Sequence, residues 1–377
     1  MECTGIKSQE LELSISNEEF LREFNKKAAR LRVPLSGNLA LTHRCSVRCL
    51  HCYLGEEVSA RENIHRELNT RQWKRIIDDI TRAGCLYLLI TGGEPLLRHD
   101  FKEIYRHAKT NGLLVTLFTN GMLIDDDIIE LFQQYSPKAV EITIYGASPG
   151  THERITRVKG SYEKTLRGIN QLIRQKINVT LKTILMTLNR HEFFDMQKLA
   201  GEWGVKFRFD AAVFPGLKGD KSPVQLRVPA EEAIEKEFSD ENRRREWKDF
   251  FVKMRDLPSQ DKDQDYLYQC GAGSTYFHID PYGNLKPCLM VTNLDLEYSL
   301  VNGDFAAGWQ EAMPRIRERK PGGDYKCNRC RKRALCGFCP AFFKLENDAE
   351  DICSQYLCAM GQRRFEKINE GQDAARE

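Results

Sequence analysis

The segment "CSVRCLHC", from Cys45 to Cys52, places three thiols in one short stretch, with Cys49 between the outer two. A structural zinc ion takes four protein ligands. His51 is the only further candidate in the segment, and we expect it to point away from a centre that the cysteines share. Iron–sulfur clusters use one thiolate per iron, so three thiolates on a four-iron cluster leave one iron open. Since an open metal position marks a catalytic site, the segment predicts a cluster with room for a chelating ligand.

The thiols follow the first of six short apolar runs that alternate with helical patterns over residues 37–212. Six strands that are each followed by a helix predict a parallel sheet. Right-handed crossovers curl such units into a barrel or most of one. The expected fold is α/β, a partial (β/α)6 TIM-like barrel, with its active site at the carboxyl ends of the strands. The six runs are residues 37–42, 85–92, 113–119, 139–145, 178–186 and 205–210. Thr70 and Asp125 are expected N-caps of two of the helices between them, and the first of these helices is expected to carry the apolar stripe Trp73, Ile76, Ile77 and Ile80.

The pattern changes on either side of this barrel. Residues 1–36 form an N-terminal extension with one expected helix at about 17–31, and residues 213–269 read as a linker and a charged helix. From 270 to about 360 the chain is rich in loops and cysteine, with a hairpin that turns at Pro281 to Asn284. We expect this region to be a small C-terminal domain that is held together by metal clusters, followed by a tail over 361–377.

Composition excludes several classes of protein. The 57 basic and 54 acidic residues give a net charge of +3, which argues against binding nucleic acid through bulk charge. The sequence contains no run of 18 apolar residues, so no membrane-spanning helix is expected. The sequence "MECTGIKSQELELS" shows no apolar signal-peptide core. The chain is therefore expected to be cytoplasmic and without membrane contact.

The 13 cysteines are unevenly placed. Their odd number and the reducing compartment disfavour a disulfide framework. Cys3 and Cys85 stand alone, and Cys85 opens an apolar run that predicts a core position. Apart from the three cysteines of the first segment, the remaining eight lie near the C-terminus. They could hold two zinc ions or iron–sulfur clusters. They are Cys270, Cys288, Cys327, Cys330, Cys336, Cys339, Cys353 and Cys358.

The spacing C-x3-C-x2-C after the first strand, with an aromatic at Tyr53, resembles the radical S-adenosylmethionine (SAM) superfamily. The resemblance implies that Cys45, Cys49 and Cys52 hold a [4Fe-4S] cluster whose open iron binds the amino and carboxylate groups of SAM. In that family an electron from the cluster cleaves SAM, and the resulting 5′-deoxyadenosyl radical abstracts hydrogen from a substrate. The cofactors carry the difficult chemistry and the protein positions it.

The segment "TGGEP" (91–95) ends the second expected strand and matches the GGE segment of the same family. Gly92 and Gly93 lack side chains, so a ligand can approach the backbone. Glu94 supplies a carboxylate for the methionyl amine of SAM.

Other matches to the family's SAM site are weaker. Thr119 and Asn120 end the third strand, and Glu141 and Thr143 share one face of the fourth by period two. The resemblance implies that Arg154 or Arg157 pairs with the SAM carboxylate. Ile184 and Leu185 are expected near the adenine.

The C-terminal cysteines resemble the SPASM extension of radical SAM enzymes, which carries two auxiliary [4Fe-4S] clusters. The resemblance implies that Cys270, Cys288 and Cys339 serve the first cluster, while Cys327, Cys330, Cys336 and Cys353 serve the second. Two departures leave this allocation open. Cys336 and Cys339 are separated by two residues rather than three, and Cys358 is an extra cysteine. Either Cys358 is the fourth ligand of the first cluster, or that cluster has an open iron.

Most SPASM enzymes act on peptides or proteins, and "EITIYGASPGTHERIT" (141–156) resembles the peptide maturases. We therefore expect modification of a ribosomally synthesised peptide or a protein, with a flavodoxin- or ferredoxin-type electron donor. A separate leader-binding protein is a further expected partner. Candidate bases are Asp210, at the end of the sixth strand, and His278 and Asp280, near the first auxiliary cluster.

Three alternatives remain. A sulfatase-maturing enzyme has an Asp directly after the second SPASM cysteine, where this chain has Leu289. A third branch of the family oxidises aminoglycoside alcohols, which are small molecules. Outside the enzymes, the cysteines could bind zinc in a scaffold protein.

Overall fold

The computed structural model describes residues 16–59, 61–255, 266–323 and 325–370. The strands are β1 (Ser36–Thr42), β2 (Tyr87–Gly92), β3 (Leu114–Thr119), β4 (Ala139–Thr143), β5 (Val179–Ile184), β6 (Lys206–Asp210), β7 (Tyr276–Ile279), β8 (Asn284–Lys286) and β9 (Tyr298–Ser299). The helices are α1 (Asn17–Arg30), α2 (Thr70–Arg82), α3 (Phe101–Thr110), α4 (Asp126–Gln134), α5 (Pro149–Thr156), α6 (Ser161–Arg174), α7 (Phe193–Glu202), α8 (Ala230–Phe238), α9 (Glu241–Arg255), α10 (Phe305–Glu311), α11 (Pro340–Asn347) and α12 (Gln355–Asn369).

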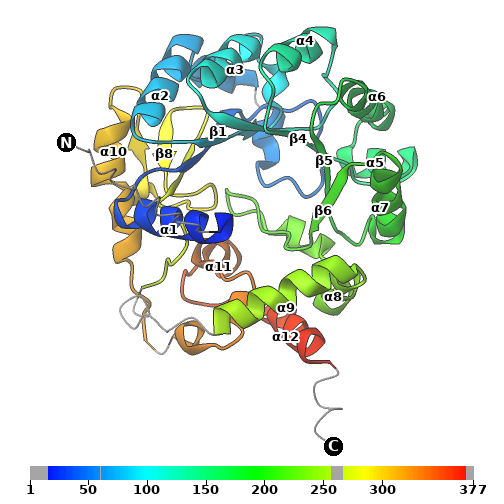
Figure 1. The fold of residues 1–377 in the computed structure, drawn as a ribbon, viewed down its shortest axis with the longest axis vertical. Coiled ribbons are helices and arrows are strands. Elements are labelled where there is room, and N and C mark those ends of the chain that lie inside the picture. Colours follow the sequence, from blue (N-terminus) through cyan, green and yellow to red (C-terminus); the bar gives the residue numbers. More distant parts are fainter. Residues whose placement is uncertain (1–15, 60, 256–265, 324, 371–377) are drawn as a thin grey trace, which may run out of the picture.

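The six expected strands are present and lie side by side in chain order, from β1 to β6, with every pair parallel. The connecting helices α2, α3, α4, α6 and α7 lie along one side of the curved sheet (Figure 1). The sheet is therefore wound in one sense, and the loops that follow all six strands gather at one end, as the sequence predicts. The structure confirms the α/β class and the six strand–helix units, in a sheet with two edges.

The same sheet continues past β1, because β7 pairs with it in parallel and β8 and β9 follow in antiparallel pairing. The expected hairpin is therefore confirmed as β7–β8. Its turn needs Gly283, whose φ is +84°. Asp280 accepts hydrogen bonds from the backbone N–H groups of Tyr282 and Asn284 and from the Asn284 side chain. The division of the chain at residue 270 stays a prediction, since one sheet crosses it.

Helix ends agree with the sequence in one case and shift in another. Asp125 accepts from the backbone N–H of Ile128 and begins α4 as expected. The prediction for α2 was wrong by one residue, because Asn69 is the N-cap and forms a capping box with Gln72. The Thr70 hydroxyl instead donates to Asp100 at 2.6 Å.

The main core lies between the sheet and its outer helices. On α2 the expected stripe of Trp73, Ile76, Ile77 and Ile80 is almost fully buried against it. Cys85 is 6% exposed in this core, so its prediction as a small core residue is confirmed. None of the described helices is long and apolar enough to cross a membrane.

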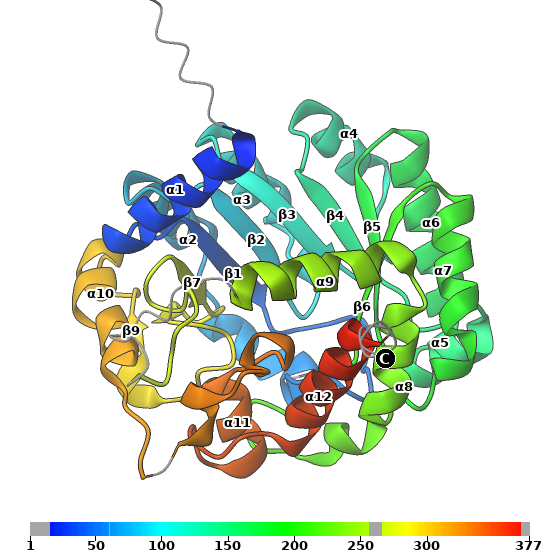
Figure 2. The same ribbon diagram turned by 60° about the horizontal axis from the view of Figure 1, so that its bottom comes forward.

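The C-terminal helices close over the carboxyl ends of the strands. Helix α12 packs along α8, and α9 crosses in front of the sheet (Figure 2). A buried ion pair joins Arg364 of α12 to Glu237 of α8 at 2.7 Å. Arg227 holds Glu346 of α11 through two hydrogen bonds of 3.0 and 3.1 Å. These contacts fix the cysteine-rich region above the barrel.

Candidate functional site

A cavity of about 630 Å³ lies at the carboxyl ends of the strands. The expected triad, Cys45, Cys49 and Cys52, lines it together with Gly92 and Gly93 from the end of β2. The structure thus brings the two segments singled out in the sequence to one cavity, and their role as a SAM site stays a prediction.

Burial dominates the electrostatics of the triad. It raises the pKa of Cys45 to about 12, and the nearby carboxyl of Glu94 raises that pKa further. Burial also raises the pKa of the Cys49 and Cys52 thiols. Buried thiols of this kind become thiolates only when a cation compensates their charge. The triad thus fits a bound metal cluster better than three isolated thiolates.

Neighbouring side chains hold the triad's loop. Asn120 donates through Nδ2 to the Ser46 hydroxyl at 2.8 Å and reaches the Cys45 Sγ at 3.9 Å. His51 was expected to point away from the site, but it lines the same cavity, with its ring edge-on to Tyr145. Its Nδ1 is buried without a hydrogen-bond partner, and burial lowers its pKa to about 4.

Gly92 and Gly93 line the cavity, where a ligand can approach their backbone. Close packing against the protein backbone is a second reason why these positions require glycine. A Cβ on Gly92 would lie 2.1 Å from the carbonyl oxygen of Thr42, and one on Gly93 would lie 2.3 Å from that of Arg44. Gly92 also has φ of +131°. The two glycines therefore let the end of β2 press against the backbone that leads into the cysteine triad.

Glu94 lies beneath the cavity and is fully buried. Its carboxylate accepts from the Thr119 hydroxyl at 2.9 Å and from the backbone N–H groups of Asn120 at 2.8 Å and Leu96 at 3.1 Å. Burial raises the pKa of Glu94 to about 7, although these hydrogen bonds oppose the shift. The predicted SAM residues Glu94, Thr119 and Asn120 are thus joined in one network beside Cys45.

The opposite wall carries charges that the sequence analysis missed. Lys182 of β5 and Arg208 of β6 line the cavity, as does Phe118 of β3. Their alternation with buried apolar residues on short strands was the signal that could have identified them. Glu141 lies beside them and pairs with Arg208 at 3.4 Å.

The remaining SAM candidates divide in two. Thr143 and Ile184 line the cavity. Leu185 is fully buried on the other side of β5, because successive side chains of a strand face opposite sides. Arg154 and Arg157 are exposed and do not line the cavity. The cavity-lining cations are instead Lys182, Arg208 and Arg243.

The candidate bases also divide. Asp210 lines the cavity and accepts from the Ala212 N–H at 2.7 Å. His278 is 2% exposed and does not line it, and burial lowers its pKa to about 3. Asp280 is held by the hairpin turn described above. The structure therefore brings Asp210 to the cavity and gives the other two positions in the sheet extension.

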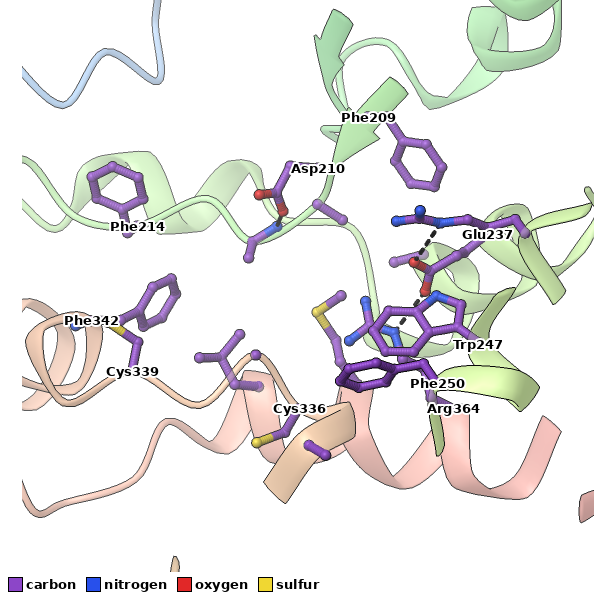
Figure 3. Close-up of a pocket in the computed structure, with 18 of the residues that line it drawn as sticks. Phe209, Asp210, Phe214, Glu237, Trp247, Phe250, Cys336, Cys339, Phe342 and Arg364 are labelled. Carbon is purple, nitrogen blue, oxygen red and sulfur yellow. Dashed lines mark hydrogen bonds and ion pairs between the residues drawn. The ribbon is translucent and has the colours of Figure 1, made fainter. Parts of the chain in front are cut away.

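A second cavity, of about 550 Å³, adjoins the first and shares Phe209, Asp210, Phe214 and Arg243 with it. Figure 3 shows Asp210 between the strand end and the cysteine-rich region, with Trp247 and Phe250 of α9 on one side. Cys336 and Cys339 line this second cavity. The two cavities therefore adjoin, one lined by the triad and the other by two of the C-terminal cysteines.

Cys270, Cys288 and Cys339 form a first neighbourhood of C-terminal thiols. Burial raises the pKa of Cys339 to about 12, and the thiols of Cys288 and Cys270 contribute to the shift. Leu289, which follows Cys288, lines the barrel cavity. This neighbourhood thus lies between the two cavities.

The second neighbourhood contains the remaining cysteines. Burial raises the pKa of Cys336 to about 11, with contributions from Cys330 and Cys327. Burial also raises the pKa of Cys358, as does a hydrogen bond with Cys353. Helix α12 approaches closely at Gly361, where a Cβ would lie 2.6 Å from the Cβ of Cys336. Among the described residues, no three His, Cys, Asp or Glu side chains are placed to coordinate one metal ion. The two groups are therefore defined by proximity and not by coordination geometry.

Residues 39–200 match the Radical SAM superfamily. An AdoMet-dependent heme synthase of Methanosarcina barkeri is 32% identical over 182 residues, which are 48% of this chain and 51% of that protein. The chain thus spans about half the length of this relative. A PqqA peptide cyclase of Bradyrhizobium diazoefficiens is 24% identical over 334 residues, 84% of this chain and 83% of that protein.

The fold also resembles solved structures. The crystal structure of Streptococcus suis SuiB bound to precursor peptide SuiA aligns with a TM-score of 0.68 and 16% identity, over 94% of this chain and 84% of that one. At this identity the likeness concerns the fold. The family match therefore identifies a radical SAM domain over residues 39–200, the part of the chain that holds the thiol triad and the GGE segment.

Proposed function

We propose that this protein is a radical SAM enzyme that modifies a ribosomally synthesised peptide or a protein. The observation that carries the proposal is the pair of adjoining cavities, one lined by the Cys45–Cys49–Cys52 triad and the other by Cys336 and Cys339. Two adjoining cavities suit an extended substrate better than a small one. The relative that spans most of the chain is a peptide cyclase, whereas the heme synthase aligns with about half of it.

The three thiols would hold the [4Fe-4S] cluster, and Glu94 with Thr119 and Asn120 would orient SAM beside it. The cluster, when bound, supplies the electron that cleaves SAM to a hydrogen-abstracting radical. The chain itself shields this chemistry, because the cavity is lined by apolar and aromatic side chains such as Val47, Phe118 and Phe214. Exclusion of water limits side reactions of a reactive species.

The two thiol neighbourhoods support two auxiliary clusters. Cys270, Cys288 and Cys339 would hold the first, and Cys327, Cys330, Cys336 and Cys353 the second. Cys358 contacts Cys353 rather than the first group. This contact favours the alternative in which Cys358 is not the fourth ligand of the first cluster and no described cysteine binds the fourth iron of that cluster.

Asp210 is the proposed base, because it lies where the two cavities meet. A sulfatase-maturing activity is disfavoured, since Leu289 brings an apolar side chain into the barrel cavity after Cys288. The proposal includes a cytoplasmic location, a flavodoxin- or ferredoxin-type electron donor and a separate leader-binding protein.

The test is anaerobic purification and reconstitution, followed by measurement of iron, sulfide and zinc. Dithionite and SAM are then added, and 5′-deoxyadenosine is measured. About twelve irons per chain with SAM cleavage support three clusters by the one-thiolate-per-iron relation. If the protein contains zinc without iron and does not cleave SAM, the enzyme proposal is wrong and the zinc-binding scaffold is the better interpretation. A Cys45→Ala variant is the control, because it removes a thiol of the triad and is expected to abolish cleavage.

A further inference from the structure

Lys182 is a half-buried lysine at the cavity wall that the proposed SAM chemistry does not use. Its Nζ lies 2.8 Å from the centre of the Phe118 ring and makes no hydrogen bond to any described residue. Burial lowers the pKa of Lys182 well below its usual range; the Glu141 carboxylate opposes this shift, and the neighbouring Arg208 adds to it. An ammonium group in such a place is unfavourable unless an anion pairs with it.

The described residues supply only part of the negative charge that would compensate Lys182. Glu141 is the nearby carboxylate, and its Oε1 is 3.4 Å from the Arg208 guanidinium. Its Oε2 is buried and has no hydrogen-bond partner. Two cations therefore share one carboxylate, and both cations face the cavity while Glu141 does not line it.

The other cavity charges are engaged elsewhere. Arg243 is within 3.2 Å of Glu246 and 3.6 Å of Glu237. Asp210 accepts from the backbone of Ala212. Of the three cations that line the cavity, Lys182 is thus the one that makes no ion pair within 4 Å to a described residue.

This wall lies away from the expected methionyl site. The sheet order places β5 three strands from β2, which ends in the GGE segment. At a spacing of about 4.8 Å between neighbouring strands, this is roughly 14 Å along the sheet. A carboxylate bound beside the cysteine triad therefore does not account for the charge at Lys182.

We propose that Lys182 and Arg208 form a subsite for a carboxylate of the substrate, the side chain of an Asp or Glu residue in the modified peptide. The proposal rests on the proposed peptide-modifying function and adds a specificity to it. Lys182, whose Nζ lies over the Phe118 ring, and Arg208 would hold the carboxylate at the barrel wall, with the peptide backbone extending toward Asp210.

The experiment uses the anaerobically reconstituted full chain with SAM bound. Two capped probes, N-acetyl-Phe-Glu-Phe-amide and N-acetyl-Phe-Gln-Phe-amide, are titrated by calorimetry into wild-type protein and into the variants K182M, K182R and K206M. Lys206 is the matched control, because it is exposed at the amino end of β6 and does not line the cavity.

We expect wild type and K206M to bind the Glu probe about tenfold more tightly than the Gln probe, as for one charge-assisted hydrogen bond. K182M should lose this preference and K182R should retain most of it, while the affinity for SAM stays within about twofold. Equal binding of the two probes by wild type, or no binding of either, overturns the subsite.

A K182M variant that loses SAM affinity but keeps the Glu preference would assign the carboxylate to SAM instead and overturn the proposal. Unchanged SAM affinity and thermal midpoint show that the variant is folded. Arg208→Met tests the other cation of the subsite and should also lose the preference for the Glu probe. The proposed function is judged separately by 5′-deoxyadenosine formation, so failure of one is distinguishable from failure of the other.

Discussion

Gly93 shows how one missing side chain supports the site. A Cβ at this position would overlap the carbonyl oxygens of Arg44 and His43, at 2.3 and 2.4 Å. We expect Gly93→Ala to displace the backbone next to Cys45 and to lower the iron content by about four atoms per chain, the content of the four-iron cluster proposed at the triad. Iron analysis and SAM titration check this.

Gly150→Ala is the control for that substitution. A Cβ on Gly150 meets nothing within 4 Å, and the residue lies within α5. Iron content and SAM affinity should equal those of wild type. Equal iron in the Gly93 variant would contradict the packing argument.

His278 predicts a dependence of stability on pH. Burial lowers its folded-state pKa to about 3, whereas an unfolded histidine titrates near 6.5. Below about pH 6.5 the unfolded chain therefore binds more protons at this site than the folded chain. Its contribution to stability is fully present above that pH and is lost as the pH falls toward 3.

The expected loss from this residue is about 1.4 kcal/mol per pH unit at most. Guanidinium unfolding of the cluster-loaded protein between pH 7.5 and 5.5 measures it. His278→Leu should show a shallower pH dependence, since the side chain no longer titrates. The same slope in both proteins would place the sensitivity elsewhere.

At the scale of elements, the cap of α2 shows how helix ends are chosen. Asn69 accepts from the Gln72 N–H at 3.0 Å, and the Gln72 side chain accepts from the Asn69 N–H at 2.9 Å. Asn69→Ala removes the side-chain acceptor of this pair and should destabilise the protein by about 1 kcal/mol. Thermal unfolding measures the loss, and exposed Arg71→Ala is a neutral control on the same helix. Equal losses in the two variants would count against the cap.

The strands show why periodicity locates elements better than it locates their ends. Runs of apolar residues identified all six barrel strands because both faces of a parallel sheet are covered. The same runs concealed Lys182 and Arg208, since a long side chain with an apolar stem fits a strand whose head group faces a polar cavity. Thr70 was predicted as an N-cap because Thr often caps helices, and only the fold shows that the neighbouring Asn69 takes this position.

At the scale of the molecule, the arrangement of the C-terminal cysteines predicts which are ligands. Cys339 lies with Cys270 and Cys288, whereas Cys358 is beside Cys353 in the other neighbourhood. We expect Cys339→Ser to lose about four irons per chain and Cys358→Ser to keep the wild-type content. Iron analysis and Mössbauer spectroscopy check both. Loss of iron in the Cys358 variant would make that residue a ligand.

Sequence alone predicted the radical chemistry proposed for this protein, because the spacing of three thiols and the GGE segment are local patterns in adjoining strand–loop units. It also determined the six strand–helix units, since apolar periodicity is a local record of burial. Tertiary structure decided which distant side chains meet. It joined β7 to the barrel sheet, placed Arg154 and Arg157 outside the cavity, brought Lys182 and Arg208 into it and set Cys358 beside Cys353. These outcomes depend on strand order, register and helix packing, which bring together residues whose separation along the chain carries no signal of contact.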